Sequence, residues 1–338
     1  MDSSSVGNPG RIARRNLLTA GLGVAAACAT APSLAQQAPV IAPPRVKGPL
    51  VWLDMDQVDL DRAFDQAQYA PNIVQVTGRY ASNSNAVRSR LGQPRHVAYG
   101  PTPIEVLDIY TTRRPKAPVQ IFLHGGAWRG GLAKNYAFAA DLFVQAGAHL
   151  VVPDFVWVQD AGGSLLPMAD QVRRVVAWVH RNAASFGGDP DRIYISGHSS
   201  GAHLAGVALT TDWRRDFGLP ADVLKGALCC SGLYDLKPVR LSARSSYVQI
   251  SDDIEQALST QRHLDRLNTP VIVAYGTLET PEFQRQSREF AAALQAAGKP
   301  VQALVGEGYN HFEIIETMAN PYGLLGRAML EQMKLTAG

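Results

Sequence analysis

Short apolar runs alternate with longer amphipathic stretches along the chain from about residue 95 onward. Runs of aliphatic and β-branched residues are typical of strands, whereas apolar residues three and four positions apart are typical of helices. The predicted strands cover residues 95–99, 104–110, 119–123, 149–153, 192–196, 226–230, 271–275 and 301–305. The predicted helices cover residues 134–146, 168–185, 199–210, 252–257, 281–297 and 312–333. This alternation favours a parallel sheet with helices on both faces.

Two of the predicted strands, residues 119–123 and 271–275, are almost entirely apolar, as expected of strands that are buried on both faces. Pro101-Thr102-Pro103 separates the first two strands and suits a hairpin, so this pair is expected to be antiparallel. The fold class is therefore α/β, with an eight-stranded, mostly parallel, twisted sheet. Upstream of the sheet, apolar residues in 51–92 have mixed spacing. One helix is predicted at residues 59–68, and we expect the segment to contribute a small N-terminal cap.

The first 35 residues have the pattern of an export signal. Arg14-Arg15 precedes an apolar run over residues 17–31, and Ser33-Leu34-Ala35 offers a small-residue cleavage site. The arginine pair followed by Asn-Leu-Leu resembles a twin-arginine signal. We therefore expect residues 1–35 to be cleaved and the mature protein to be periplasmic or secreted.

Two alternatives to a cleaved signal are a membrane span and a lipid anchor in the same segment. The apolar run is shorter than the roughly 20 residues that a membrane span requires, so no stable membrane insertion is expected. Lipid attachment at Cys28 is the other alternative, and Ala25 at the start of such a motif disfavours it. Residues 36–50 are rich in Pro and are expected to form a linker, followed by a single domain over residues 51–338.

Charge and cysteine content exclude several function classes. The net charge is +3, and removal of residues 1–35, which contain three arginines and one aspartate, leaves +1, so no nucleic-acid partner is expected. Cys229 and Cys230 are adjacent, too close for an unstrained bridge, and are expected to be buried thiols. His198 and His203 have no cluster of further ligands at metal spacing, so neither a metal nor a cofactor is expected. The oligomeric state has no signature in the sequence.

The strongest chemical motif is Gly197-His198-Ser199-Ser200-Gly201, which lies between a predicted strand and a predicted helix. Gly-x-Ser-x-Gly in that context predicts a nucleophile elbow, a sharp turn that exposes the serine hydroxyl above the carboxyl edge of the sheet. Ser199 is the predicted nucleophile, because of the two serines it alone has the required spacing to both glycines. The following helix N-terminus favours negative charge nearby.

A glycine-rich segment, His124-Gly125-Gly126-Ala127, follows the apolar strand at residues 119–123. Glycines at a strand end let backbone N–H groups approach a ligand closely, and such groups stabilise the oxyanion of an acyl-transfer intermediate. The predicted donors are the N–H groups of Gly126, Ala127 and Ser200, with Gly125 as a competing choice. The segment lacks the Gly-Lys-Ser/Thr of a phosphate-binding loop.

A serine nucleophile requires a general base and a carboxylate that orients the base. In the chain order nucleophile, acid, histidine, the histidine is expected after the last strand, where His311 lies. The acid is expected after the strand at residues 271–275, and Glu279 precedes the next predicted helix. Glu282 in the first turn of that helix is the main alternative, followed by Asp235.

These motifs together resemble the arylformamidase (kynurenine formamidase) group of α/β-hydrolases and, more loosely, the hormone-sensitive-lipase-like esterases. The resemblance runs from about residue 60 to residue 335 and implies the α/β-hydrolase fold. By that match Ser199, Glu279 and His311 take the triad positions, although the family pattern usually has Asp where this chain has Glu279. The matching stretches are residues 124–128, 197–204, 231–236, 281–287 and 310–313.

The sequence therefore predicts an exported serine hydrolase of the carboxylesterase or aryl-amidase type, acting on small esters or amides. Trp128, Phe155 and Trp157 follow strand ends and are expected to present aromatic walls to the substrate. The family resemblance offers an alternative, an arylformamidase that acts on N-formylkynurenine. An acyltransferase would have the same motifs, and the alternative outside enzymes is a non-catalytic binding module.

The choice of acid can be tested by substitution. Glu279→Ala is expected to cost far more ester-hydrolysing activity than Glu282→Ala, because only the former removes the carboxylate that orients His311. Steady-state rates with a chromogenic short-chain ester measure both variants. The reverse order of activities would assign the acid to Glu282.

Overall fold

The computed structural model describes residues 45–336, and Lys47–Gly338 forms one compact unit. The predicted export signal and most of the predicted linker lie outside the described residues. No helix within residues 45–336 has the length and apolar character needed to cross a membrane.

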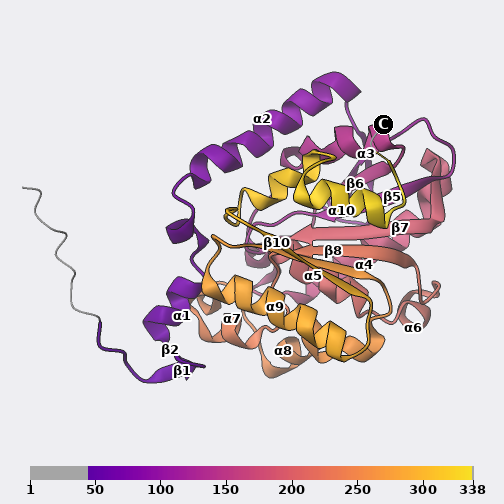
Figure 1. Cartoon of the computed structure of the whole chain (residues 1–338). Coiled ribbons are helices and arrows are strands. Elements are labelled where there is room, and N and C mark those ends of the chain that lie inside the picture. The colour runs from indigo at the N-terminus through magenta and orange to yellow at the C-terminus, as the bar shows by residue number, and fades with distance from the viewer. Residues whose placement is uncertain (1–44, 337–338) are drawn as a thin grey trace, which may run out of the picture. The chain divides into compact units, whose positions relative to one another are not determined.

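An eight-stranded sheet organises this unit, as predicted (Figure 1). The strand order is β10-β9-β8-β7-β5-β6-β4-β3, and the pairs from β10 to β6 are parallel. β4 pairs antiparallel with β3 and with β6, which confirms the hairpin predicted around Pro101-Thr102-Pro103. The strands are β3 (Arg95–Ala98), β4 (Val106–Tyr110), β5 (Ala117–Leu123), β6 (His149–Pro153), β7 (Gly188–His198), β8 (Leu224–Cys230), β9 (Val271–Gly276) and β10 (Val301–Gly306).

Helices cover both faces of the sheet, because alternate strand side chains point to opposite faces and are apolar on both. In β5, Val119, Ile121 and Leu123 pack with α4 (Leu166–Asn182), α5 (Ser200–Leu209) and α9 (Pro281–Ala296). Phe122 packs with the opposite layer, which contains α2 (Ile73–Leu91), α3 (Ala140–Ala146) and α10 (Leu324–Gln332). Figure 1 shows this second layer above the sheet and α9 below it.

Shorter helices complete the connections between these elements. The α-helices are α1 (Gln57–Ala63), α6 (Trp213–Phe217), α7 (Lys237–Leu241) and α8 (Asp252–Leu258). The 3-10 turns are η1 (Gln66–Tyr69), η2 (Ala133–Asn135), η3 (Ala137–Ala139), η4 (Val158–Ala161), η5 (Ala183–Phe186), η6 (Ala243–Ser246), η7 (Thr260–Arg262), η8 (Leu264–Arg266) and η9 (Ile314–Ala319).

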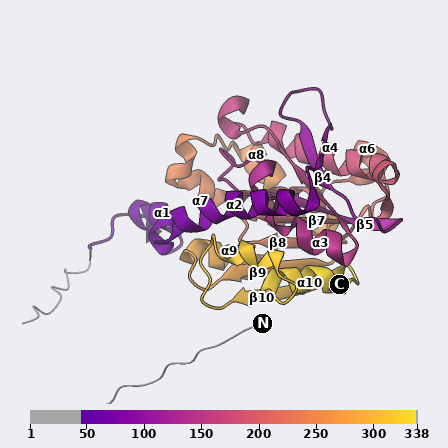
Figure 2. The same ribbon diagram turned by 90° about the horizontal axis from the view of Figure 1, so that it is seen from above.

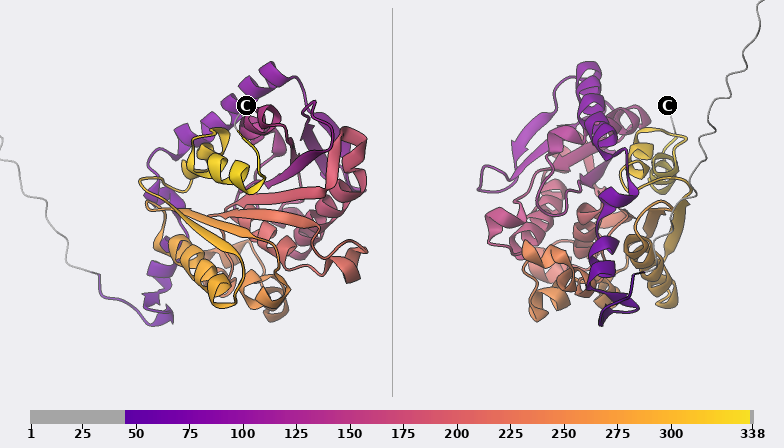
Figure 3. Two further views of the ribbon diagram at one scale, coloured as in Figure 1. Left: turned by 45° about the vertical axis from the view of Figure 1, so that its right-hand side comes forward. Right: turned by 90° about the vertical axis from the view of Figure 1, so that its left-hand side faces the viewer.

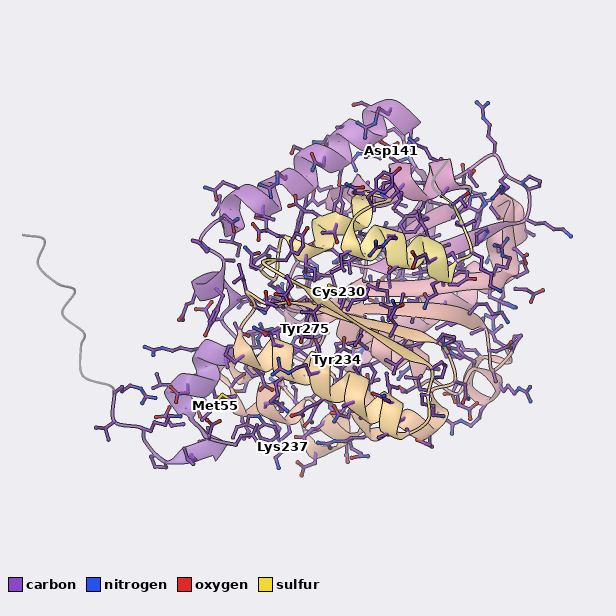
Figure 4. All side chains as sticks on the ribbon, in the orientation of Figure 1. Met55, Asp141, Cys230, Tyr234, Lys237 and Tyr275 are labelled. Carbon is purple, nitrogen blue, oxygen red and sulfur yellow. The ribbon has the colours of Figure 1, made fainter. Side chains whose placement is uncertain are left out.

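The N-terminal segment is more structured than the sequence predicts. It begins with the small hairpin β1 (Leu50–Trp52) and β2 (Met55–Asp56), followed by α1, η1 and the long helix α2. Lys237 of α7 lies over the ring of Trp52, at 5.9 Å from its centroid, and Figure 4 labels Lys237 and Met55 in this region. The ribbon turned to show this side displays the segment crossing one end of the unit (Figure 3, right).

Helix α2 was not predicted, because its buried side is narrow and mixed in character. Only Val76, Tyr80, Ser84 and Val87 are buried, at helical spacing, and the other positions are mostly polar. Tyr80 packs against Phe138 of η3, with ring centroids 5.4 Å apart. Figure 2 shows α2 lying across this face of the unit.

Two predicted helices are interrupted. The predicted helix at residues 312–333 is η9 followed by α10, and the break contains Pro321, which lacks the N–H that a helix interior requires. The predicted helix at residues 134–146 begins as the two 3-10 turns η2 and η3 before α3. The predicted helix at residues 59–68 corresponds to α1 and η1.

The crossing of α5 over β5 and β7 leaves no room for side chains at two positions. A Cβ added to Gly201 would lie 2.1 Å from the carbonyl oxygen of Leu123, and one added to Gly197 would lie 2.1 Å from that of Gly201. Both obstacles are backbone atoms, which cannot rotate away as a side chain can. The two glycines are therefore required for the first turn of α5 to approach the centre of the sheet.

Gly201→Ala is expected to lower the free energy of unfolding by at least ~2 kcal/mol, because the added methyl group overlaps the Leu123 carbonyl. The matched control is Gly78→Ala in α2, where an added Cβ meets no atom within 4 Å. That change is expected to raise stability by about 0.5–1 kcal/mol through helix propensity. Urea unfolding followed by tryptophan fluorescence measures both, and equal effects would contradict the close-approach explanation.

Candidate active site

The loops that follow five neighbouring strands meet at the carboxyl edge of the sheet. Each supplies one part of the site: the glycine-rich loop after β5, Ser199 after β7, Ser231 after β8, Glu279 after β9 and His311 after β10. Carboxyl edges of parallel α/β sheets are where such folds place their ligand sites. The strand topology therefore brings together residues that are far apart in sequence.

Ser199 occupies the sharp turn that its motif predicts. Its φ is 57° and its ψ is −124°, a conformation that residues with a side chain rarely adopt. The turn is held by the Ser199 N–H, which donates to the carbonyl of Cys230 at 2.9 Å. Helix α5 begins at the next residue, so the serine lies at its N-terminus.

Glu279 and His311 form a buried hydrogen-bonded pair. The distance between His311 Nδ1 and Glu279 Oε2 is 2.6 Å, and both side chains are almost fully buried. Glu279 Oε1 accepts from the Gly276 N–H at 2.7 Å and from the Ser231 hydroxyl at 2.6 Å. Gln66 Nε2 lies 3.3 Å from Oε2 and 3.2 Å from His311 Nδ1. The donors from Gly276, Ser231 and Gln66 fix the carboxylate, and the carboxylate in turn accepts from Nδ1–H of the imidazole.

The alternative acids are engaged elsewhere. Glu282 forms a two-pronged ion pair with Arg285, with Oε–N distances of 2.6 and 2.8 Å. Asp235 accepts from the Lys237 N–H and lies 3.3 Å from Arg262. Neither carboxylate contacts the imidazole, so the geometry favours Glu279 as its partner.

The longer glutamate side chain reaches back to its own strand. Its Oε1 caps the N–H of Gly276, the last residue of β9, while Oε2 faces the imidazole. The carboxylate thus lies over the strand end, and the loop absorbs the additional methylene. This is how the chain accommodates Glu279 where the resembling family usually has Asp.

His198, next to the serine, contacts both the backbone carbonyl and the ring of His311. Its Nε2 lies 2.8 Å from the His311 carbonyl oxygen, and the two rings are 4.6 Å apart. A carbonyl oxygen only accepts, so Nε2 carries the proton. Burial and the neighbouring imidazole lower the pKa of His198 well below its ordinary value, and the ring is therefore neutral. No group of metal-ligating side chains occurs within residues 45–336.

The glycine-rich loop bends sharply beneath the serine. Gly126, Ala127 and Trp128 all have positive φ, at 133°, 52° and 61°. A Cβ on Gly125 would lie 3.1 Å from the Ser199 Cβ, which shows how closely the loop approaches the serine. In the described part of the chain, no acceptor binds the N–H groups of Gly126, Ala127 and Ser200.

The three aromatic residues expected to wall the pocket lie elsewhere. Trp128 is buried in the core, where its indole N–H donates to His203 Nδ1 at 3.1 Å. The ring of Phe155 stacks on His124 at 4.5 Å, and the Trp157 indole donates to the Gly131 carbonyl at 3.1 Å. All three side chains are therefore engaged in contacts that support the surrounding loops, and none of them lines the Ser199 cavity. The expectation of an aromatic wall is therefore not met at this site.

Ser199 and His311 line one cavity of about 320 Å³. No hydrogen bond joins the serine hydroxyl to the imidazole among the described residues, although both face this space. The remaining lining is contributed by the glycine-rich loop, the N-terminal segment and two arginines. The lining residues are Gln66, Thr77, Tyr80, Gly125, Gly126, Ala127, Arg129, Tyr136, His198, Ser199, Arg244, His311 and Phe312.

Sequence reasoning missed two residues of this site. Ser231 directly follows an apolar strand, a position that indicates the carboxyl edge of the sheet and could have drawn attention to it. Gln66 has no such signal, because it reaches the Glu279–His311 pair from a segment more than 200 residues earlier.

In sequence, this chain is similar to kynurenine formamidases and to esterases. A family model described as BD-FAE matches residues 107–227. The kynurenine formamidase of Danio rerio is 29% identical over 295 residues, covering 83% of this chain and 98% of the relative. The esterase LipQ of Mycobacterium tuberculosis is 29% identical over 239 residues, covering 62% of this chain and 55% of the relative.

Solved structures share the fold at lower sequence identity. A putative thioesterase from a Silicibacter species superposes with a TM-score of 0.67 at 21% identity, covering 78% of this chain and 95% of that one. The propionate-bound esterase Est2 of Thermogutta terrifontis gives a TM-score of 0.60 at 19% identity, covering 73% and 97%.

The buried His203 gives a stability prediction. Burial lowers the pKa of His203 to about 4, so the folded protein keeps it neutral where the unfolded chain, with a pKa near 6.5, takes up a proton. Its contribution is therefore complete above pH 6.5 and is lost as the pH falls toward 4, by about 2 kcal/mol between pH 7 and pH 5.

His203→Gln removes this titration while keeping a donor and an acceptor at the site. The stability gap between wild type and variant is expected to narrow from pH 7 to pH 5 in urea unfolding experiments. A gap that is the same at both pH values would show that protonation of His203 does not limit acid stability.

Proposed function

We propose that this chain, which has the α/β-hydrolase fold and is similar to kynurenine formamidases and esterases, is a serine hydrolase that cleaves small carboxylic esters. Ser199 is its nucleophile, His311 its general base and Glu279 the orienting acid. The observation that supports this proposal most directly is the 2.6 Å hydrogen bond between Glu279 and His311 at the cavity that Ser199 lines.

In the proposed reaction, His311 Nε2 takes the proton of the Ser199 hydroxyl as its oxygen attacks the substrate carbonyl carbon. Glu279 keeps the other proton on Nδ1 and stabilises the imidazolium that forms. The hydroxyl and the imidazole approach to bonding distance when substrate fills the cavity, as is common in this type of site.

As the serine oxygen bonds to the carbonyl carbon, the π electrons of the carbonyl move onto its oxygen. The free N–H groups of Gly126, Ala127 and Ser200 donate hydrogen bonds to the oxyanion that forms. Loss of one such donor typically costs about 3–4 kcal/mol of transition-state stabilisation. Collapse of the intermediate breaks the bond to the leaving group, which His311 protonates. Water, deprotonated by His311, then attacks the acyl-enzyme and releases the acid and Ser199.

N-formylkynurenine is the second candidate substrate. The relatives named kynurenine formamidase align over 98% of their own length, whereas the isoprenylcysteine methylesterases and LipQ align over 54–61% of theirs. We favour exogenous esters because the first 35 residues have the pattern of an export signal, which would place the enzyme outside the compartment where N-formylkynurenine forms. Parallel assays of 4-nitrophenyl acetate and N-formylkynurenine separate the two, and much faster turnover of the formamide would reverse the preference.

A fluorophosphonate probe tests the nucleophile without assuming a substrate. Wild type is expected to be labelled at Ser199, and Ser199→Ala is expected to lose labelling and at least ~10⁴-fold in kcat with the fold intact. Ser200→Ala is the matched control, because the role proposed for Ser200 belongs to its backbone N–H, and it should still be labelled. Labelling that survives in Ser199→Ala would overturn the proposal. An unlabelled wild type would also overturn it and would favour a non-catalytic binding module.

A further inference from the structure

Two arginines in the lining of the Ser199 cavity have no carboxylate partner. Arg129 follows the glycine-rich loop and Arg244 belongs to η6. Within residues 45–336 neither guanidinium forms an ion pair, and no Asp or Glu lines this cavity. The polar lining near the serine therefore carries an excess of positive charge.

Several arginines elsewhere in the described chain are paired with a carboxylate, whereas the half-buried Arg88 and Arg192 donate to backbone carbonyls instead. Arg285 binds Glu282 at 2.6 Å, Arg174 binds Glu105 at 2.5 Å, and Arg262 binds Glu255 at 2.5 Å. Pairing of this kind is expected, because a charge removed from water without a partner is costly. Arg244, which is half-buried, has no carboxylate partner, and neither does Arg129, which is exposed to solvent at the same cavity.

Arg244 is held in position by groups that do not neutralise it. One Nη donates to the Phe64 carbonyl at 3.0 Å, and the guanidinium lies 5.3–5.9 Å from the ring centroids of Phe64, Trp128 and Phe283. Burial lowers the pKa of Arg244, which is the direction expected for a cation that lacks an anion. A guanidinium has five N–H donors, so donors remain for a ligand.

Arg129 lies over the ring of Tyr247, with its Cζ 4.3 Å from the centroid. Asp65 is a carboxylate whose charge acts on Arg244 electrostatically. Its oxygens accept hydrogen bonds from the Ala67 N–H and the Gln68 side chain. Asp65 thus lies near the arginines without forming an ion pair with Arg244.

A second hollow, of about 640 Å³, adjoins the Ser199 cavity. Both spaces are lined by Gln66, Ala127, Arg129, Arg244 and Phe312. The two arginines therefore lie at the junction of the Ser199 cavity and the wider hollow. A substrate whose carbonyl reaches Ser199 would extend past them.

We propose that Arg129 and Arg244 form a carboxylate-binding subsite, so that the preferred substrates are esters or amides carrying a carboxylate a few bonds from the scissile carbonyl. A planar guanidinium matches a carboxylate with two parallel N–H···O bonds. The inference rests on the proposed role of Ser199, which it deepens by naming the substrate class.

The kinetic test compares two esters of nearly equal shape, 4-nitrophenyl hydrogen glutarate and its methyl ester, which differ in one negative charge. Wild type is expected to prefer the acid by at least ~10-fold in kcat/KM, because only the acid offers a charged carboxylate to the two guanidinium groups. Arg244→Gln and, independently, Arg129→Gln should each reduce this ratio by about 10-fold or more, mainly through KM for the acid. Arg215→Gln, at an exposed arginine paired with Asp216, is the control and should keep the ratio.

A binding measurement separates this inference from the proposed function. Calorimetric titration of glutarate into Ser199→Ala is expected to show binding that Ser199→Ala/Arg244→Gln and Ser199→Ala/Arg129→Gln lack. Binding that depends on the arginines supports the subsite even if the wild type hydrolyses neither ester. Equal kcat/KM for both esters in an active, probe-labelled wild type, or glutarate binding unaffected by both substitutions, overturns it while leaving the role of Ser199 intact.

Discussion

The backbone contact between the first turn of α5 and the end of β5 is the constraint on which the site depends. Gly201 lies against the Leu123 carbonyl with no space for a side chain, and Gly197 lies equally close to Gly201. This contact forces the turn at Ser199 into its positive-φ conformation and brings the glycine-rich loop beneath it. Ser199 and the free N–H groups near it are thus positioned by packed backbone, which is stiffer than an arrangement of side chains.

The second half of the site is built differently, from hydrogen bonds between side chains and strand ends. Glu279 accepts from groups on three segments besides His311: Gly276 at the end of β9, Ser231 after β8 and Gln66 in η1. These hydrogen bonds hold the carboxylate in one place, and a fixed carboxylate fixes the imidazole. Because His198 also binds the His311 backbone, the histidine is restrained at both its ring and its carbonyl.

The strands of the sheet could be predicted from the sequence, whereas one of the helices that cover the sheet and one residue of the site could not. β9 was found because strands buried on both faces leave an unbroken apolar run, and His149–Pro153 was predicted with its observed bounds for the same reason. Helix α2 escaped because one of its four buried positions is Ser84 and its exposed positions are strongly polar. Local patterns also pointed to Ser199, Glu279 and His311 as candidates, since each follows a strand end, and the structure brings Glu279 and His311 into contact. Gln66 could not be found, because only the tertiary fold relates it to residues beyond 270.

The reach of Gln66 across the whole chain has a consequence for biosynthesis. The earliest element of the site, η1, meets the Glu279–His311 pair only after β9 and β10 have joined the sheet, and contacts of such long sequence separation form late and slowly. A chain that ends before residue 311 lacks His311 and cannot form the contacts that join Gln66, Glu279 and His311. The arrangement of the site is therefore complete only when the N-terminal segment and the last strands of the sheet are both in place.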